Sequence, residues 1–244
     1  MKKILNLLTV LVVMTFLLSV TSLQIAAAAP NLESASEWAR DSITTAVAKG
    51  FVPADVQSDY TNVITRQEFC RMAIKWVEYA TDRNIDFVLS SRGLSRDLNA
   101  FSDTSDPDIL AAYALGITNG TGDGQFTPNG QFNREQAATM IMNTCRVIGF
   151  DVDNPPASGF ADIGSASSWA VDGINFVRAN GIMQGTGNNY FSPKATYTRE
   201  QSIITFNNIM LGSVGISNEW GDDWMNEDNL SLYDDDWVYE EYDG

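Results

Sequence analysis

The sequence predicts an all-α protein in which three helix–loop–helix units pack together as one body. Two recurring features lead to this prediction. First, an apolar stretch with helical spacing ends at a glycine three times along the chain, and glycine is the usual residue just past a helix end. Second, a strong helix start follows each glycine after a loop. Such recurrence is typical of repeat proteins, whose units bury their apolar faces against one another.

The first helix of each unit leads to the glycine. These helices are expected to end at Gly50, Gly116 and Gly181. In the third unit, side chains such as Ile174 and Val177 share one helical face. Twelve residues before the glycine stands Trp38 in the first unit and Trp169 in the third, but Thr104 in the second. The shared register indicates that the three segments are copies of one unit.

The second helix of each unit begins with a capping box. The cap residues are Thr65, Asn133 and Thr198, and three positions later stand Glu68, Gln136 and Gln201. In this motif the two side chains satisfy backbone N–H groups that the first helical turn leaves without partners. Apolar stripes continue each helix and are expected to form core rather than a cofactor site. Because one helix pair cannot bury its own apolar face, the units are expected to pack together.

The first 28 residues are expected to be a signal peptide that is removed on secretion. Two lysines precede an apolar run from Ile4 to about Val20, and the small residues of QIAAAAP fit a cleavage site after Ala28. The alternative is an uncleaved membrane anchor, but the run lies at or below the length that a spanning helix needs. No stable membrane insertion is expected after cleavage.

The composition excludes several classes of protein. The formal charge is −16, but eleven of the 31 acidic residues lie between Val214 and Gly244, where there is no basic residue. The rest of the chain is therefore only mildly acidic, and nucleic acid is not an expected partner. Histidine is absent, which excludes His-dependent triads and His-ligated zinc. No nucleophile, base or metal constellation stands out, so we expect no enzyme activity, no cofactor and no metal site.

The two cysteines, Cys70 and Cys145, lie in apolar helical stretches. We expect them to be buried free thiols, with a disulfide between them as the alternative.

An arginine follows each cap and therefore stands in the first turn of the second helix. These residues are Arg66, Arg134 and Arg199. A cation there opposes the helix macrodipole, so stability alone does not select it. One explanation is an ion pair with a neighbouring unit's carboxylate, such as Asp103 or Asp162. The other, which the threefold recurrence favours, is an anion site where the guanidinium and free backbone N–H groups converge on a ligand carboxylate or phosphate.

Several further motifs recur with the arginines. They are the Phe-x-Asp openings at 101–103 and 160–162, the Trp-Ala pairs at 38–39 and 169–170, the Gly-Ile helix ends, the loops GTGDGQFTP and GTGNNYFSP, and the helix starts TRQE, NREQ and TREQ. In this order and spacing they resemble S-layer homology (SLH) domains in three tandem copies, over roughly residues 35–212. The resemblance implies a pseudo-threefold helical body.

The chain is expected to divide into a signal peptide (1–28), a first SLH repeat (35–80), a linker (81–100), a second repeat (101–150), a linker (151–158), a third repeat (159–212) and an acidic aromatic tail (213–244).

The resemblance implies noncovalent attachment to the bacterial cell wall, through grooves between repeats that bind secondary cell-wall polysaccharide. In the family this polymer commonly carries pyruvylated sugars, whose fixed carboxylate an arginine at a helix start can bind by charge-assisted hydrogen bonds. The glycines would let the backbone approach the sugar, and a tryptophan would cover an apolar sugar face. The expected location is secreted, in the cell wall or S-layer at the cell surface.

The resemblance also implies a set of glycan-binding residues. They are Trp38, Arg66, Asp103, Gly120, Gly122, Arg134, Asp162, Trp169, Gly185, Gly187 and Arg199. The third unit carries the complete pattern, and the second has Thr104 at the tryptophan position. The first unit lacks the glycine loop and a clear Phe-x-Asp opening. Because the family's grooves combine residues of neighbouring units, the sequence does not assign a complete groove.

The tail, residues 213–244, is expected to be disordered and solvated because of its acidic charge. Its tryptophans and tyrosines leave open a docking segment for a basic protein partner, or weak binding of divalent cations. The alternative function is therefore an envelope assembly or interaction protein, whose tail recruits a partner while the repeats only localise it.

Overall fold

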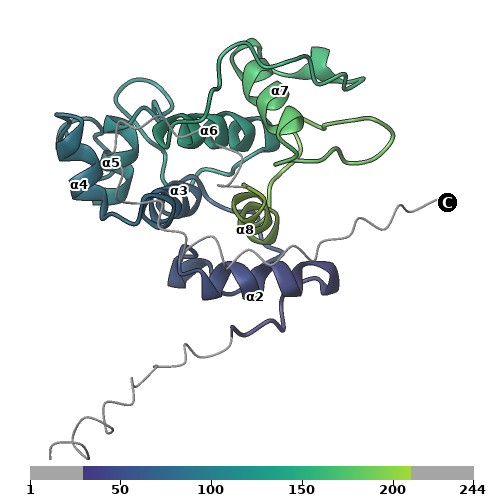
Figure 1. Ribbon diagram of the computed structural model, residues 1–244, viewed down its shortest axis with the longest axis horizontal. Helices are drawn as coiled ribbons and strands as arrows, with labels where there is room; N and C mark the ends of the chain where they lie inside the picture. Colours follow the sequence, from purple (N-terminus) through teal and green to yellow (C-terminus); the bar gives the residue numbers. More distant parts are fainter. Residues whose placement is uncertain (1–29, 210–244) are drawn as a thin grey trace, which may run out of the picture.

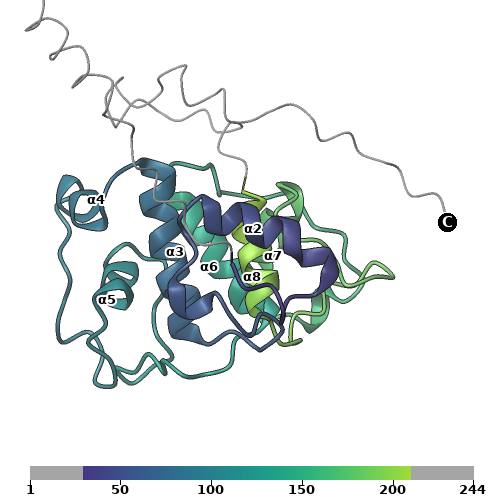
Figure 2. The same ribbon diagram turned by 90° about the horizontal axis from the view of Figure 1, so that it is seen from below.

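The computed structural model describes residues 30–209, and in this range the chain is helical (Figure 1 and Figure 2). The α-helices are α2 (Arg40–Ala48), α3 (Arg66–Thr81), α4 (Ile85–Ser91), α5 (Pro107–Ala114), α6 (Arg134–Val147), α7 (Val171–Ala179) and α8 (Arg199–Asn207). Four short 3-10 helices accompany them: η1 (Glu37–Ala39), η2 (Ala54–Val56), η3 (Ile163–Ser165) and η4 (Ser168–Ala170).

Between residues 30 and 209 no strand forms, and only isolated bridges pair the loops. The prediction of an all-α protein is therefore confirmed. None of the helices in this range is both long and apolar enough to cross a bilayer. The predicted signal peptide and acidic tail lie outside the described residues.

The predicted capping boxes are all present. At the start of α3, the Thr65 hydroxyl accepts from the N–H of Glu68, and the Glu68 carboxylate accepts from the N–H of Thr65 at 2.9 Å. The starts of α6 and α8 have the same reciprocal pair, with Asn133 and Gln136, and with Thr198 and Gln201. The predicted glycine ends are also confirmed: Gly50, Gly116 and Gly181 have φ of 81°, 72° and 66°, which L side chains rarely adopt.

Each unit's first helix packs on the second helix of the unit before it. Thus α5 lies on α3, and α7 lies on α6 (Figure 1). In the first unit, α2 packs on α8 of the third unit. The helix contacts therefore return to the first unit after three steps. The finer expectation, a pseudo-threefold symmetry of the whole body, stays a prediction.

The segment 81–100, expected only to connect two units, contains α4. Asn84 caps this helix by accepting from the N–H of Phe87, and its apolar side chains Ile85, Val88 and Leu89 are buried. These three residues stand at helical spacing in the sequence, which is the pattern that predicts a helix here. In the structure α4 packs against α3 and α5.

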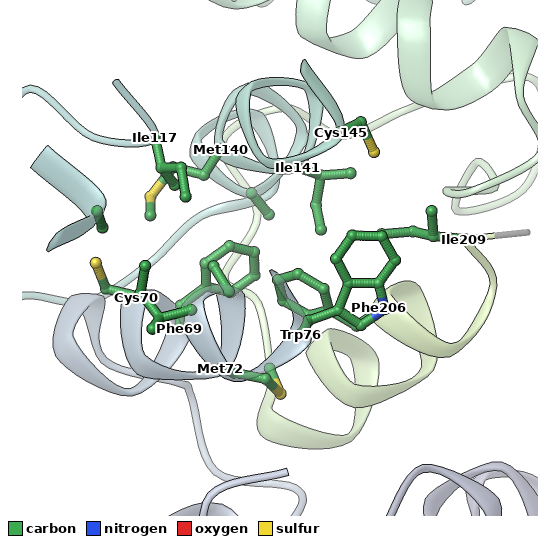
Figure 3. Close-up of a cluster of buried hydrophobic side chains, with 14 of the residues drawn as sticks. Phe69, Cys70, Met72, Trp76, Ile117, Met140, Ile141, Cys145, Phe206 and Ile209 are labelled. Atoms are coloured by element: carbon green, nitrogen blue, oxygen red, sulfur yellow. The ribbon is translucent and has the colours of Figure 1, made fainter. Parts of the chain in front are cut away.

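Side chains from all three units meet in the core, as Phe69, Ile141 and Phe206 show in Figure 3. The Phe69 ring on α3 lies 4.5 Å from the Phe132 ring of the second unit and 5.2 Å from the Phe206 ring of the third, between ring centroids. Cys70 and Cys145 are buried and free, as expected, and burial raises the pKa of both thiols. The core is thus shared among the units rather than repeated within each.

The third unit is not expected to fold alone, because both of its helices have their packing partners in other units. A peptide spanning residues 159–212 should give a circular dichroism spectrum of a mostly unfolded chain. The matched control is residues 30–212, which should be helical and melt in one transition. A sharp, cooperative melt of the single unit would contradict the shared core.

Candidate functional site

The start of each second helix is held against a loop of the next unit. The N–H of Arg66 donates to the carbonyl of Gly130, and the N–H of Gln67 donates to the carbonyl of Pro128. The same two bonds run from Arg134 and Glu135 to Ala195 and Pro193, and from Arg199 and Glu200 to Asn62 and Tyr60. We call these contacts the first junction (Arg66 with the loop 120–131), the second junction (Arg134 with the loop 185–196) and the third junction (Arg199 with the loop 58–63).

These bonds use the N–H groups that a helix start leaves unsatisfied. The loop carbonyls take the first two, and the capping side chain takes the third. The expectation that free backbone N–H groups join the arginine in binding an anion is therefore wrong. The sequence did not reveal this because each carbonyl lies at least 58 residues away along the chain.

Arg66 and Arg134 are buried, and each side chain reaches the loop of the next unit. Nε of Arg66 donates to the carbonyl of Phe126 at 2.9 Å, and Nε of Arg134 donates to that of Phe191 at 2.7 Å. The guanidinium also lies over the ring of the same phenylalanine, 4.9 and 4.6 Å from its centroid. Both arginines are only 7% exposed, and burial lowers the pKa of each.

Neither buried arginine has a carboxylate within ion-pair distance among residues 30–209. Asp103 instead accepts from the loop N–H groups of Phe126 and Thr127, at 2.8 and 2.7 Å. The hydrogen bond from Phe126 is the main reason why the pKa of Asp103 lies below its ordinary value. Asp162 makes the equivalent two bonds to Phe191 and Ser192. The suggested ion pairs with Asp103 and Asp162 are therefore not formed, and these carboxylates hold the loops.

Arg199 differs from the other two arginines because it has an internal ion pair. One terminal nitrogen lies 2.6 Å from Oε1 of Glu68. The other donates to the carbonyl of Ser58 at 2.9 Å and lies 3.8 Å from Oδ2 of the exposed Asp59. Burial alone would raise the pKa of Glu68, but the hydrogen bonds from Arg199 and Thr65 hold it below its ordinary value. The expected ion pair with a neighbouring unit's carboxylate therefore forms at Arg199, but the partner is Glu68 of α3 rather than Asp103 or Asp162.

The two predicted tryptophans are exposed and stand next to a glutamate–serine contact. Trp38 is 63% exposed and Trp169 is 55% exposed. Two residues before Trp169, the N–H and Oγ of Ser167 donate to the Glu135 carboxylate at 2.9 and 3.0 Å. Ser36 and Glu200 make the same contact beside Trp38.

Sequence reasoning missed these glutamates. The available signal was a serine two residues before each tryptophan and a glutamate directly after the arginine of α6 and α8. At the second junction Nζ of Lys194 also contacts Glu135, at 2.5 Å. The contacts hold Ser36 and Ser167, the residues directly before η1 and η4, against the helix start of the preceding unit.

The four predicted glycines fall into two classes. A Cβ atom on Gly120 would lie 2.6 Å from the carbonyl oxygen of Gln125, and one on Gly185 would lie 2.7 Å from that of Tyr190. These two are required by the packing of the turn itself. Gly122 and Gly187 have φ near 107° and 106°, and no atom within 4 Å of the Cβ position. Only this second pair leaves open space in front of the backbone.

The second junction brings together the most complete set of predicted residues. It combines Arg134 of the second unit with Asp162, Trp169, Gly185 and Gly187 of the third. The first junction combines Arg66 with Asp103, Gly120 and Gly122, and has Thr104 at the tryptophan position. The third junction has only Trp38 and Arg199. By sequence Arg199 belongs to the most complete unit, but it faces the first unit, whose loop lacks the glycines.

Comparison with known proteins identifies the family of two units. Residues 96–138 and 159–201 each match the S-layer homology domain. These ranges correspond to the second and third units. The first unit is not among the matched residues, and its assignment to the family stays a prediction.

Similar proteins include two surface-layer proteins and an endoglucanase. The chain is 30% identical over 131 residues to an endoglucanase of Bacillus sp. (strain KSM-635), which covers 50% of the chain and 14% of that protein. It is 26% identical over 174 residues to an S-layer protein of Bacillus thuringiensis subsp. finitimus, covering 69% of the chain and 20% of that protein. The chain is 24% identical over 176 residues to a surface-layer 125 kDa protein of Lysinibacillus sphaericus, and the match covers 70% of the chain and 14% of that protein.

The chain therefore spans a fifth or less of the length of these relatives. Their similarity, together with the two family matches, confirms the predicted location at the cell surface.

Proposed function

We propose that this chain, two of whose units match the S-layer homology domain, attaches noncovalently to the bacterial cell wall by binding an anionic, pyruvylated secondary cell-wall polysaccharide at the first and second junctions. One observation carries the proposal. Arg66 and Arg134 are buried cations that backbone carbonyls hold in place, and neither has a carboxylate partner within residues 30–209. The carboxylate of a pyruvyl ketal supplies that partner.

The energetics favour an anionic ligand at these arginines. A guanidinium has five N–H donors, and Arg134 gives one from Nε and one from a terminal nitrogen to the carbonyls of Phe191 and Gln184. Its side chain is already ordered, so binding a ligand costs little further rotamer entropy. A charge-assisted hydrogen bond to a carboxylate then contributes about 1.5–3 kcal/mol.

The neighbouring residues suit a sugar. Trp169 offers an exposed apolar ring that can cover one sugar face. The open space in front of Gly187 lets a ligand approach the backbone. In this proposal Asp103, Asp162, Gly120 and Gly185 act by holding the loops in shape, and Trp38 and Arg199 form the least complete site. The alternative function, in which the tail recruits a partner, depends on residues outside the described range and stays a prediction.

The proposal is tested by sedimentation with purified cell wall. The protein should pellet with native wall and remain in solution with wall from which the pyruvyl ketals have been removed by mild acid. Added salt should weaken the retention, because the contact is between charges that solvent ions can screen. Equal retention by native and depyruvylated wall would contradict an anion-dependent site.

Trp169→Ala should weaken binding to native wall by about tenfold, because the exposed ring loses its contact with the sugar. The melting temperature should not change, since the side chain is mostly outside the core. Trp38→Ala is the matched control, because this tryptophan has the same glutamate–serine contact but stands at the junction without the glycine loop. A larger loss from Trp38→Ala than from Trp169→Ala would contradict the ranking of the junctions.

A further inference from the structure

We propose that Glu68 closes the third junction by taking, within the protein, the place that a ligand carboxylate takes at the other two, so that the chain has two anion sites rather than three. The inference rests on the proposed function and adds a residue that determines the number of sites. It comes from a difference between the helix starts and from the ion pair that this difference creates.

The first unit exchanges two residues at its helix start. The starts of α6 and α8 read Arg-Glu-Gln, whereas that of α3 reads Arg-Gln-Glu. The acidic residue has therefore moved from the position after the arginine to the capping position, Glu68. Capping does not explain the exchange, because Gln136 and Gln201 accept from their cap N–H groups as Glu68 does.

The exchange gives the capping side chain of α3 a second carboxylate oxygen, which the glutamines at the other two helix starts lack. Glu68 accepts from the Thr65 N–H with Oε2 and from Arg199 with Oε1. Gln136 and Gln201 use their only oxygen for the cap, and the remaining atom is an amide nitrogen, which is a donor. A guanidinium is also only a donor, so an amide at this position cannot satisfy it.

The order of the junctions assigns each capping residue to one arginine. Arg199 meets the loop of the first unit and also Glu68 at that unit's helix start. By the same order Arg66 faces the unit that contains Gln136, and Arg134 faces the unit that contains Gln201. Of the three arginines, only Arg199 faces a glutamate at the capping position, and only Arg199 has a hydrogen-bonded carboxylate partner among residues 30–209. Asp59, 3.8 Å from its other terminal nitrogen, is an exposed and more distant partner.

The orientation of Arg199 supports this reading. Nε of Arg66 donates to the carbonyl of Phe126, and Nε of Arg134 donates to the carbonyl of Phe191. Each of these carbonyls stands eight residues before the arginine of the next unit. Arg199 reaches the equivalent carbonyl, that of Ser58, with a terminal nitrogen instead. Its Nε is buried without a hydrogen-bond partner among residues 30–209. The pair with Glu68 therefore coincides with a guanidinium turned away from the arrangement at the other junctions.

The exchange also removes the glutamate–serine contact at the first junction. The residue after the arginine there is Gln67, which donates to Asn129 rather than binding a serine. This junction is also the one with Thr104 in place of tryptophan. The exchange of Gln67 and Glu68 therefore explains two differences among the junctions. Arg199 has an ion pair with Glu68 at the third junction, and the glutamate–serine contact is lost at the first.

The test follows each arginine separately by NMR. Uniformly ¹⁵N-labelled protein is titrated with a methyl glycoside that carries one pyruvyl ketal, and with the same glycoside without the ketal. The side-chain Nε–H resonances of Arg66, Arg134 and Arg199 are assigned with single Arg→Lys variants. In the wild type the ketal probe should shift the resonances of Arg66 and Arg134 and leave that of Arg199 in place. In Glu68→Gln it should shift all three.

The possible outcomes separate the two proposals. If the Arg199 resonance moves in the wild type as the others do, or stays in place in Glu68→Gln while the others move, the inference about Glu68 is overturned and the proposed function stands. If the ketal probe moves none of the three in either protein, the proposed function fails, and the inference falls with it.

Two further variants keep the test independent of stability. Gln201→Glu places a carboxylate at the capping position that faces Arg134, so the Arg134 resonance should stop responding while that of Arg66 still responds. The double change Gln67→Glu with Glu68→Gln restores the residue order of the other two units, and serves if Glu68→Gln alone does not fold. A continued response of Arg134 in Gln201→Glu would also overturn the inference.

Discussion

Replacing Arg134 with alanine is expected to lower the free energy of unfolding by about 2–4 kcal/mol and to remove the glycan binding proposed for the second junction. The substitution leaves the carbonyls of Phe191 and Gln184 without their donors and removes the cation from the Phe191 ring. Relief of the unfavourable helix dipole returns only about 0.3–1 kcal/mol, so the lost contacts decide the sign. Denaturant unfolding measures the first effect, and sedimentation with native wall measures the second.

Arg40→Ala is the matched control for this variant. Arg40 is also the first residue of a helix, α2, but its side chain is exposed. It makes no buried contacts among residues 30–209, and its dipole cost is no larger than that of Arg134 because η1 runs directly into α2. Its removal should leave stability nearly unchanged. If Arg134→Ala unfolded at the same denaturant concentration as Arg40→Ala, the structural role of the buried arginine would be refuted.

Phe69→Ala is expected to lower the free energy of unfolding by about 3–5 kcal/mol. The ring contacts Phe132 and Phe206, so the cavity would lie where all three units meet (Figure 3). Because the core is shared, the whole body should lose stability in one transition at a lower temperature. Calorimetry and circular dichroism should report the same midpoint.

The control for Phe69 is Phe87→Ala on α4, whose ring is 47% exposed and should cost less than about 1 kcal/mol. Two separated transitions in Phe69→Ala, with part of the helix content lost early, would indicate units that fold independently. That result would contradict a single cooperative body.

The sequence was sufficient for features that depend on neighbouring residues. The capping boxes at Thr65, Asn133 and Thr198 and the helix ends at Gly50, Gly116 and Gly181 rest on local backbone chemistry, and all are present. The helix α4 was missed although its apolar spacing is also local, because the segment was read as a connection between repeats.

The sequence was insufficient for the candidate site because the residues proposed for it come from different units. Nothing local to Arg199 indicates that it meets Glu68, 131 residues away, rather than the glycine loop of its own unit. The role of Asp103 was likewise missed, since its carboxylate binds loop N–H groups 23 and 24 residues further on. Residue type and recurrence identified the candidates, but only the folded chain assigns them to junctions.

The return of the third unit onto the first limits how such a protein can grow. In an open stack of repeats each end exposes an apolar face, which a specialised terminal unit covers, and copies can be added at either end. Here the two faces that would be ends cover each other, because α2 packs on α8. A closed arrangement of this kind is finite, as ring-shaped oligomers are. A fourth copy added to the chain would find both of these faces covered, unless α2 and α8 first separated.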